Sequence, residues 1–144
     1  MMNFILRCAI AVILCPLLLC RLLGVDIKIG RLPCTRYGHL SKNSDLFLRR
    51  YIAGKIGSGY FFIVSLPEKH DLVANRSLLE IISKAYRAQS KIFLVRSSFF
   101  YRGWDRIQPI LQQYESFVEL DYGSCEIEFS TLPIALILDN KRID

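Results

Sequence analysis

The densest group of reactive side chains lies in the stretch 31–43, which reads RLPCTRYGHLSKN. His39 can exchange a proton near neutral pH, so it is a candidate general base. Arg31 and Arg36 carry a fixed positive charge and can hold phosphate through paired hydrogen bonds. Together these residue types suit proton abstraction from a hydroxyl group beside an anionic ligand.

Two other residues of this stretch complete the candidate site. Gly38 has no side chain, so the backbone can approach a ligand closely there. Asn43 could bind a ligand hydroxyl, or it could cap a helix that begins at this position. His39 could instead only hydrogen-bond within its loop, and Arg36 could be solvated or in contact with lipid headgroups. We take His39 as the candidate catalytic residue and Arg31, Arg36, Gly38 and Asn43 as candidate substrate-binding residues.

Three short segments predict the β-strands that would position this site. Asp26–Leu32 is short and alternates polar and apolar residues, which fits a first strand. Tyr60–Leu66 is a continuous aromatic and β-branched run, which indicates a strand buried on both faces. Lys91–Arg96 has a similar apolar centre. Phe117–Tyr122 and Leu132–Leu138 are weaker candidates for further strands.

Helical patterns lie between these strands. A helix is expected from residue 43 or 44 to about 53, and a second follows a capping-box pattern over residues 77–87. A weaker pattern covers residues 104–114 and contains a proline. The alternation predicts an α/β fold, a Rossmann-like parallel sheet with flanking helices. Ligands of such sheets bind beyond the carboxyl ends of the strands, and the stretch 31–43 follows the first strand.

Residues 1–25 form a separate hydrophobic segment, with Arg7 and Arg21 near the ends of its apolar part. Our first interpretation is a membrane anchor, either a signal anchor or a helix that lies in the membrane interface. A cleaved signal peptide and a buried core helix are the alternatives. Basic residues are more frequent after the segment than before it, so the main domain is expected on the cytoplasmic side.

The positive charge of the chain is concentrated in its first part. Residues 1–60 contain nine Lys or Arg and two Asp or Glu, whereas residues 61–144 contain ten and eleven. This asymmetry predicts an anionic neighbour, which could be a lipid surface, a phosphate-bearing ligand or a nucleic acid. The alternative is a solvated basic face. Aromatic and basic residues interleave over residues 86–106, but we interpret them as core aromatics beside solvated cations, so no nucleic-acid partner is expected.

Several other classes of site have no signal in the sequence. The five cysteines include no CxxC or Cys/His pair with zinc-ligand spacing. Acidic residues surround Gly123, but their alternation suggests the exposed faces of strands rather than a cation site. His70 and Asp71 form a candidate catalytic pair, for which a surface turn is the preferred interpretation. The sequence also contains no GxxxxGK[ST], GxGxxG, GxSxG or HExxH motif, and we expect no metal and no cofactor.

The stretch RYGHLSKNSDLFLRR resembles the start of a sequence-defined family of bacterial glycosyltransferases. In that family a strand precedes the pattern R-x-G-H-[LF]-x-x-N-x-[DE]-[LIY]-[FY]-L, and a second strand follows it. The matching residues of this chain are Arg36, Gly38, His39, Leu40, Asn43, Asp45, Leu46, Phe47 and Leu48. The resemblance covers about residues 26–96. It implies a GT-B-like fold, in which an N-terminal Rossmann-like half receives the acceptor and a C-terminal half binds the nucleotide sugar.

For this chain the resemblance implies the acceptor-binding part of a membrane-associated glycosyltransferase of cell-surface glycan synthesis. Residues 26–144 would form the acceptor-side half domain, truncated before the donor half. The chain alone is then expected to be inactive and to use a nucleotide sugar only with a second domain or subunit. A lipid-linked or saccharide acceptor would bind beside His39. The alternative function is a non-catalytic membrane-associated binding module or a degenerate remnant of the enzyme.

Overall fold

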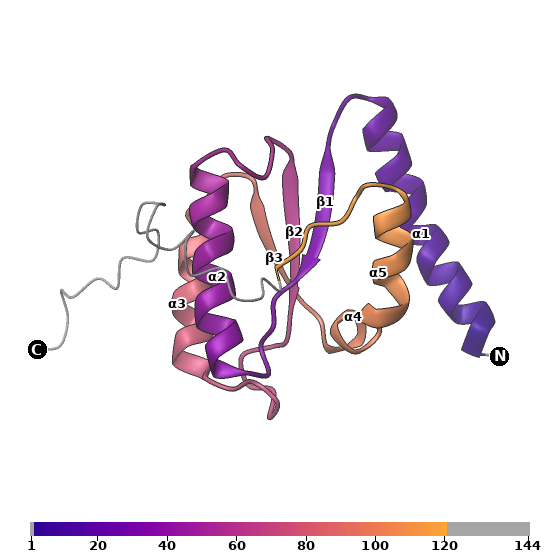
Figure 1. The fold of residues 1–144 in the computed structure, drawn as a ribbon. Coiled ribbons are helices and arrows are strands. Elements are labelled where there is room, and N and C mark those ends of the chain that lie inside the picture. The colour runs from indigo at the N-terminus through magenta and orange to yellow at the C-terminus, as the bar shows by residue number, and fades with distance from the viewer. Residues whose placement is uncertain (1, 121–144) are drawn as a thin grey trace, which may run out of the picture.

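The structure is a computed structural model that describes residues 2–120 of the chain. Its elements alternate between helices and strands, as Figure 1 shows. In chain order they are α1 (Met2–Leu22), β1 (Ile27–Arg31), α2 (Tyr37–Ile52), β2 (Tyr60–Ser65), α3 (Arg76–Arg87), β3 (Ile92–Arg96), α4 (Ser98–Arg102) and α5 (Trp104–Gln113).

The three strands form one parallel sheet in the order β1-β2-β3. Ile29 of β1 stands opposite Phe62 of β2, which in turn stands opposite Phe93 of β3. Helices α2 and α3 lie against one face of the sheet, and α4 and α5 lie on the other side (Figure 1). The prediction of a Rossmann-like parallel sheet flanked by helices is therefore confirmed.

The chain after α5 returns to the free edge of β1. Ile29 N donates to Ser116 O at 2.8 Å, and Val118 N donates to Ile29 O at 3.1 Å. Phe117 thus forms a parallel bridge to Ile29, on the edge of β1 away from β2. Within the described residues, the predicted strand Phe117–Tyr122 amounts to this single bridge. The other weak strand candidate, Leu132–Leu138, lies outside the described residues.

We call the side of the sheet that contacts α2 and α3 the closed face. Phe61 and Ile63 of β2 point to it, and both are fully buried. The ring of Phe47 from α2 packs edge-on against Phe61 at 5.7 Å between centroids, and it lies 5.6 Å from the ring of Tyr86 from α3. The aromatic side chains therefore join sheet and helices into one hydrophobic core.

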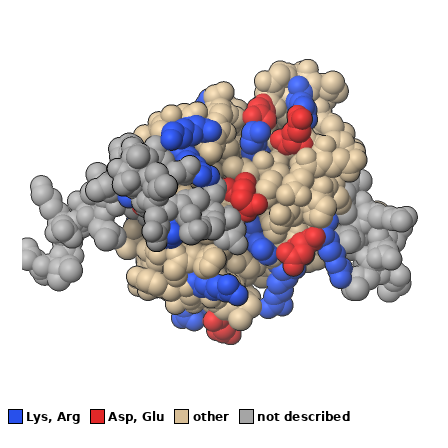
Figure 2. All heavy atoms as spheres, in the orientation of Figure 1, with Lys and Arg blue, Asp and Glu red and all other residues tan. Residues whose placement is uncertain are grey.

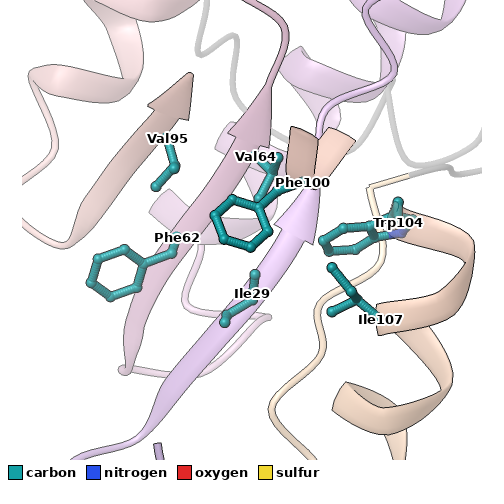
Figure 3. A pocket seen from close by; sticks show the side chains of 7 residues that line it. All are labelled: Ile29, Phe62, Val64, Val95, Phe100, Trp104 and Ile107. Atoms are coloured by element: carbon teal, nitrogen blue, oxygen red, sulfur yellow. The ribbon is translucent and has the colours of Figure 1, made fainter. Parts of the chain in front are cut away.

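We call the opposite side the open face, because α4 and α5 cover it only in part. Tyr60 and Phe93 are 40% and 41% exposed there, and Phe93 stacks on Phe62 at 5.0 Å between ring centroids. The prediction that β2 is buried on both faces is therefore wrong at Tyr60. Between the strands and α5 lies an apolar pocket of about 160 Å³ (Figure 3). Its lining residues are Ile29, Phe62, Val64, Val95, Phe100, Trp104 and Ile107.

The helices differ from expectation mainly at their starts. Helix α2 begins at Tyr37, six residues before the predicted start at residue 43. Helix α3 has Asn75 as its N-cap, whose side chain accepts a hydrogen bond from Leu78 N at 2.8 Å, so the predicted capping box is wrong. The short α4 was not predicted, whereas α5 matches the predicted helix over residues 104–114 and contains Pro109.

The apolar N-terminal segment folds into α1, whose last turn packs against the domain. Leu17 joins the core, and Arg21 Nη1 donates to Tyr114 O at 2.7 Å. Arg21 also pairs with Glu115 at 2.6 Å. Among residues 2–120, no helix combines the length and the apolar character needed to cross a membrane. The spanning form of the predicted anchor therefore has no support from the structure.

Candidate functional site

A polar concavity lies where the strands end, between the start of α2 and α4. It has a volume of about 430 Å³, and we call it the cationic hollow. Its lining residues are Arg31, Pro33, Thr35, Arg36, His39, Leu72, Tyr101 and Arg102. In the orientation of Figure 1 the strands end toward the lower part of the molecule, and Figure 2 shows basic side chains on that part of the surface with acidic ones among them. The segments after all three strands contribute to it, with α4 as the segment after β3, as expected for a ligand site in a parallel sheet.

Arg31, the last residue of β1, is held in the hollow from two sides. Its guanidinium carbon lies 5.4 Å from the ring centroid of Tyr101 and 5.9 Å from that of Trp104. Its Nη1 lies 3.6 Å from the carboxylate of Asp105. Cation–π contacts and this ion pair orient the guanidinium, while about a third of the side chain stays exposed. Arg31 can therefore present its remaining donors to a ligand.

Arg36 and His39 come to the hollow from the start of α2. Arg36 occupies the N-cap position with an extended backbone, and its side chain makes no capping hydrogen bond. His39 lies in the first turn, half-buried. The first N–H groups of a helix lack acceptors within the helix, and they favour an anion near this end. Of the five predicted site residues, the structure brings together Arg31, Arg36 and His39.

The other two predicted site residues do not reach the hollow. Because α2 begins at Tyr37, both are helical rather than part of a loop. Asn43 falls in the second turn and is 1% exposed, so it is neither the predicted helix cap nor accessible to a substrate. Gly38 is exposed, and no atom lies within 4 Å of the place a Cβ would occupy. No neighbouring group within the described chain therefore requires a glycine at this position.

Tyr101 was missing from the predicted site, and it links α4 to the loop after β1. Cys34 N donates to the Tyr101 hydroxyl at 3.0 Å. Burial raises the pKa of the Cys34 thiol to about 11, although hydrogen bonds to Leu66 and Tyr101 and the charge of Arg31 lower it in part. Burial, followed by the charge of Cys34, also raises the pKa of Tyr101. Both groups are therefore neutral near pH 7, which makes this thiol a poor nucleophile.

Arg102 is absent from the predicted site, and for His70 the sequence favours a surface turn over a catalytic role. Arg102 lies at the end of α4 and lines the hollow, and its Nη2 is 3.3 Å from His70 Nε2. His70 comes from the loop after β2 and accepts a hydrogen bond from Leu72 N at Nδ1, at 3.2 Å. The sequence signal for Arg102 is the interleaving of aromatic and basic residues over residues 86–106, which by itself indicates core aromatics beside solvated cations. The fold turns one of those cations toward the hollow.

The composition of the cationic hollow favours an anionic ligand. Its lining supplies three guanidinium groups, one imidazole and the hydroxyls of Thr35 and Tyr101. Within the described chain none of the eight lining residues is a carboxylate, and Asp105 offsets the charge of Arg31 alone. Among residues 2–120 there is also no group of three His, Cys, Asp or Glu side chains that could hold a metal. The acidic residues around Gly123 lie outside this range, apart from Glu119. Concentrated positive charge in a concave site attracts phosphate-bearing molecules.

Comparison with known proteins adds no family to this geometry. No protein-family model, no curated protein and no solved structure matches the chain. A Rossmann-like arrangement supports many unrelated functions, so the fold does not specify one. Function has to be argued from the residues of the hollow.

Proposed function

We propose that the chain is the acceptor-binding part of a membrane-associated glycosyltransferase of cell-surface glycan synthesis. The observation that carries the proposal is the placement of His39 beside Arg31 and Arg36 in one hollow at the carboxyl ends of the strands. The resemblance of residues 36–48 to the glycosyltransferase pattern supports the same function. The nucleotide sugar would be bound by a second domain or subunit.

In this proposal His39 is the catalytic base. It takes the proton of the acceptor hydroxyl while the hydroxyl oxygen forms a bond to the anomeric carbon of the donor sugar. The bond from that carbon to the nucleoside diphosphate breaks, and the diphosphate leaves with the electron pair. Arg31 and Arg36 hold a phosphate of a lipid-linked or saccharide acceptor, which brings the hydroxyl to the imidazole.

Membrane association is part of the same proposal. Helix α1 would lie in the membrane interface, with apolar residues toward the acyl chains and the main domain on the cytoplasmic side. The excess of basic residues in the first part of the chain suits contact with anionic headgroups. Such a position would place the hollow near lipid-linked acceptors.

A second candidate is a non-catalytic membrane-associated binding module. The observation that favours it is that this chain supplies three guanidinium groups and an imidazole to the hollow. In this proposal these groups bind an anionic saccharide or lipid, and no sugar is transferred. The two functions differ in whether a sugar is transferred, so a transfer assay separates them.

The test uses the full chain with membranes from cells that lack it, which supply the second subunit. Labelled nucleotide sugars and a polyprenyl phosphate acceptor are added, and incorporation of label into lipid is measured. Loss of the base in His39→Ala should lower transfer by roughly 100-fold or more while acceptor binding persists. Arg87→Ala, an exposed cation at the end of α3, is the matched control and should keep full transfer.

The outcomes separate the two candidates. Equal transfer by wild type and His39→Ala would remove the catalytic role of the imidazole. Acceptor binding without transfer from any nucleotide sugar would favour the binding module over the enzyme.

A further inference from the structure

Each ring nitrogen of His70 faces an N–H group of another residue. Leu72 N donates to Nδ1 at 3.2 Å, so Nδ1 must offer a lone pair. A neutral imidazole carries its single proton on the other nitrogen when one nitrogen accepts. His70 in this state therefore presents an N–H group at Nε2.

The Nε2 atom faces another donor. Arg102 Nη2 lies only 3.3 Å away, and a guanidinium group can donate but not accept hydrogen bonds. With the opposite tautomer Nε2 would accept from Arg102, but Nδ1 would then carry a proton against Leu72 N. In either tautomer the three groups present three N–H groups and a single acceptor nitrogen, so two N–H groups face each other without an acceptor. An oxygen atom of a ligand beside Nε2 and Nη2 would accept from both.

The nearby carboxylates already pair with other side chains. Glu68, in the same loop as His70, pairs with Arg96, and Asp71 lies 3.8 Å from Arg76. Arg102 is exposed at the wall of the cationic hollow, where a molecule from solution can reach it. Water can accept from these donors in the free protein, and an anionic group that enters the hollow can take its place.

We propose that Arg102 and His70 bind a phosphate group of the ligand, with one phosphate oxygen accepting from Arg102 Nη2 and His70 Nε2. Phosphate suits this place because charge-assisted hydrogen bonds from guanidinium to phosphate are short and strong. The inference rests on the proposed function for the identity of the ligand as an acceptor. It specifies that acceptor as phosphorylated, and it excludes a neutral saccharide.

The experiment measures phosphate binding directly on the full chain. Inorganic phosphate is titrated by calorimetry, with glucose as the neutral comparison, and the imidazole ¹⁵N resonances of His70 are followed by NMR. Loss of a charge-assisted hydrogen bond in Arg102→Gln should weaken phosphate binding about tenfold or more. Arg106→Gln removes an exposed cation that does not line the hollow, and it should change the affinity less than twofold. Phosphate should also shift the Nε2 resonance of His70 in the wild-type chain.

A second arm identifies the source of the phosphate. Vesicles that contain an anionic phospholipid replace inorganic phosphate in the same comparison of variants. Weaker vesicle binding by Arg102→Gln, with no such loss in Arg106→Gln, would support a lipid headgroup as the phosphate source. If Arg102→Gln weakens the binding of inorganic phosphate but not of vesicles, the result would support a soluble phosphate ester as the ligand.

Two results would overturn the proposal. The first is equal affinity of wild type and Arg102→Gln for both phosphate sources. The second is a His70 ring whose resonances do not respond to phosphate. This inference and the proposed function can fail separately. Phosphate binding without sugar transfer would support the phosphate site and contradict the transferase. Sugar transfer by Arg102→Gln with an unchanged acceptor KM would support the transferase and contradict the phosphate site.

Discussion

The two faces of the sheet use the same strands but reach different degrees of burial. On the closed face, Phe61 and Ile63 are fully buried under α2 and α3. On the open face, Tyr60 of β2 and Phe93 of β3 are about two-fifths exposed. Both faces are lined by aromatic and aliphatic residues, so composition does not distinguish them. What distinguishes them is the length of helix that crosses each face.

The two faces of the sheet support different walls of the cationic hollow. The closed face anchors α2, which carries Arg36 and His39, through the buried contact of Phe47 with Phe61. The open face carries α4 and α5, which bring Tyr101 and Arg102 to the hollow over a smaller core. We therefore expect the two walls of the cationic hollow to differ in stability, with the α2 wall the more rigid.

The largest effect is expected from deleting an aromatic ring of the closed face. Phe61→Ala should lower the free energy of unfolding by about 3–5 kcal/mol, because it leaves a cavity beneath two other rings. Phe93→Ala on the open face should cost about 1 kcal/mol, because that ring already contacts water. Chemical denaturation of the two variants measures the difference. Similar losses in both would show that the faces are equally packed.

A second prediction concerns the joint between the open-face helix α4 and the loop after β1. The raised pKa of Cys34, about 11 against an ordinary 9.0, means that the folded state keeps a proton that the unfolded state loses. Stability from this joint is therefore complete below pH 9 and is lost as the pH rises to 11. The loss is about 2–3 kcal/mol, and the raised pKa of Tyr101 adds to it in the same direction.

Denaturation between pH 8 and 11 with a reducing agent checks this dependence. Cys34→Ala removes the thiol and should flatten the profile, whereas Phe61→Ala should lower stability without changing its shape. An unchanged profile in Cys34→Ala would contradict a buried protonated thiol.

The smallest effect is expected from a pair of glycine substitutions. A Cβ at Gly30 would lie 2.8 Å from both Val118 Cγ1 and Val118 O, and it would also meet Leu120. Gly30→Ala should therefore cost on the order of 1–3 kcal/mol by overpacking. Gly38→Ala meets no atom within 4 Å in a helix and should be neutral or stabilising by up to about 1 kcal/mol.

Thermal or chemical unfolding of both glycine variants gives the comparison. Phosphate affinity should be retained in Gly38→Ala, because this glycine does not line the hollow. A loss of stability in Gly38→Ala that equals the loss in Gly30→Ala would contradict the described packing at the β1 edge.

The strands were predictable because their signal is local. Apolar and β-branched runs located β1, β2 and β3 to within one residue at each end. The start of α2 was not predictable, because its N-cap residue makes no capping hydrogen bond with its side chain and a glycine lies in its first turn. Burial of Leu40 against the core extends the helix there, and that contact depends on the fold.

The candidate site divides in the same way. Arg31, Arg36 and His39 lie within nine residues of one another, so their grouping was visible in the sequence. Arg102 ends α4, which follows β3, and His70 lies in the loop after β2. Only the parallel order of the sheet brings Arg102 to the same hollow, with His70 beside it. The spacing of these residues in the sequence does not predict the contact between Arg102 and His70.

The return of the chain to the free edge of β1 also constrains the order in which the protein can assemble. The pairing of Ile29 with Phe117, and the contact of Arg21 with Glu115 across 94 positions, join the two ends of the described chain. During synthesis β1 can pair with β2 early, but its other edge stays uncovered until nearly all of residues 2–120 have left the ribosome. Such distant pairings slow folding, so this edge should be the last part of the sheet to acquire protection from hydrogen exchange.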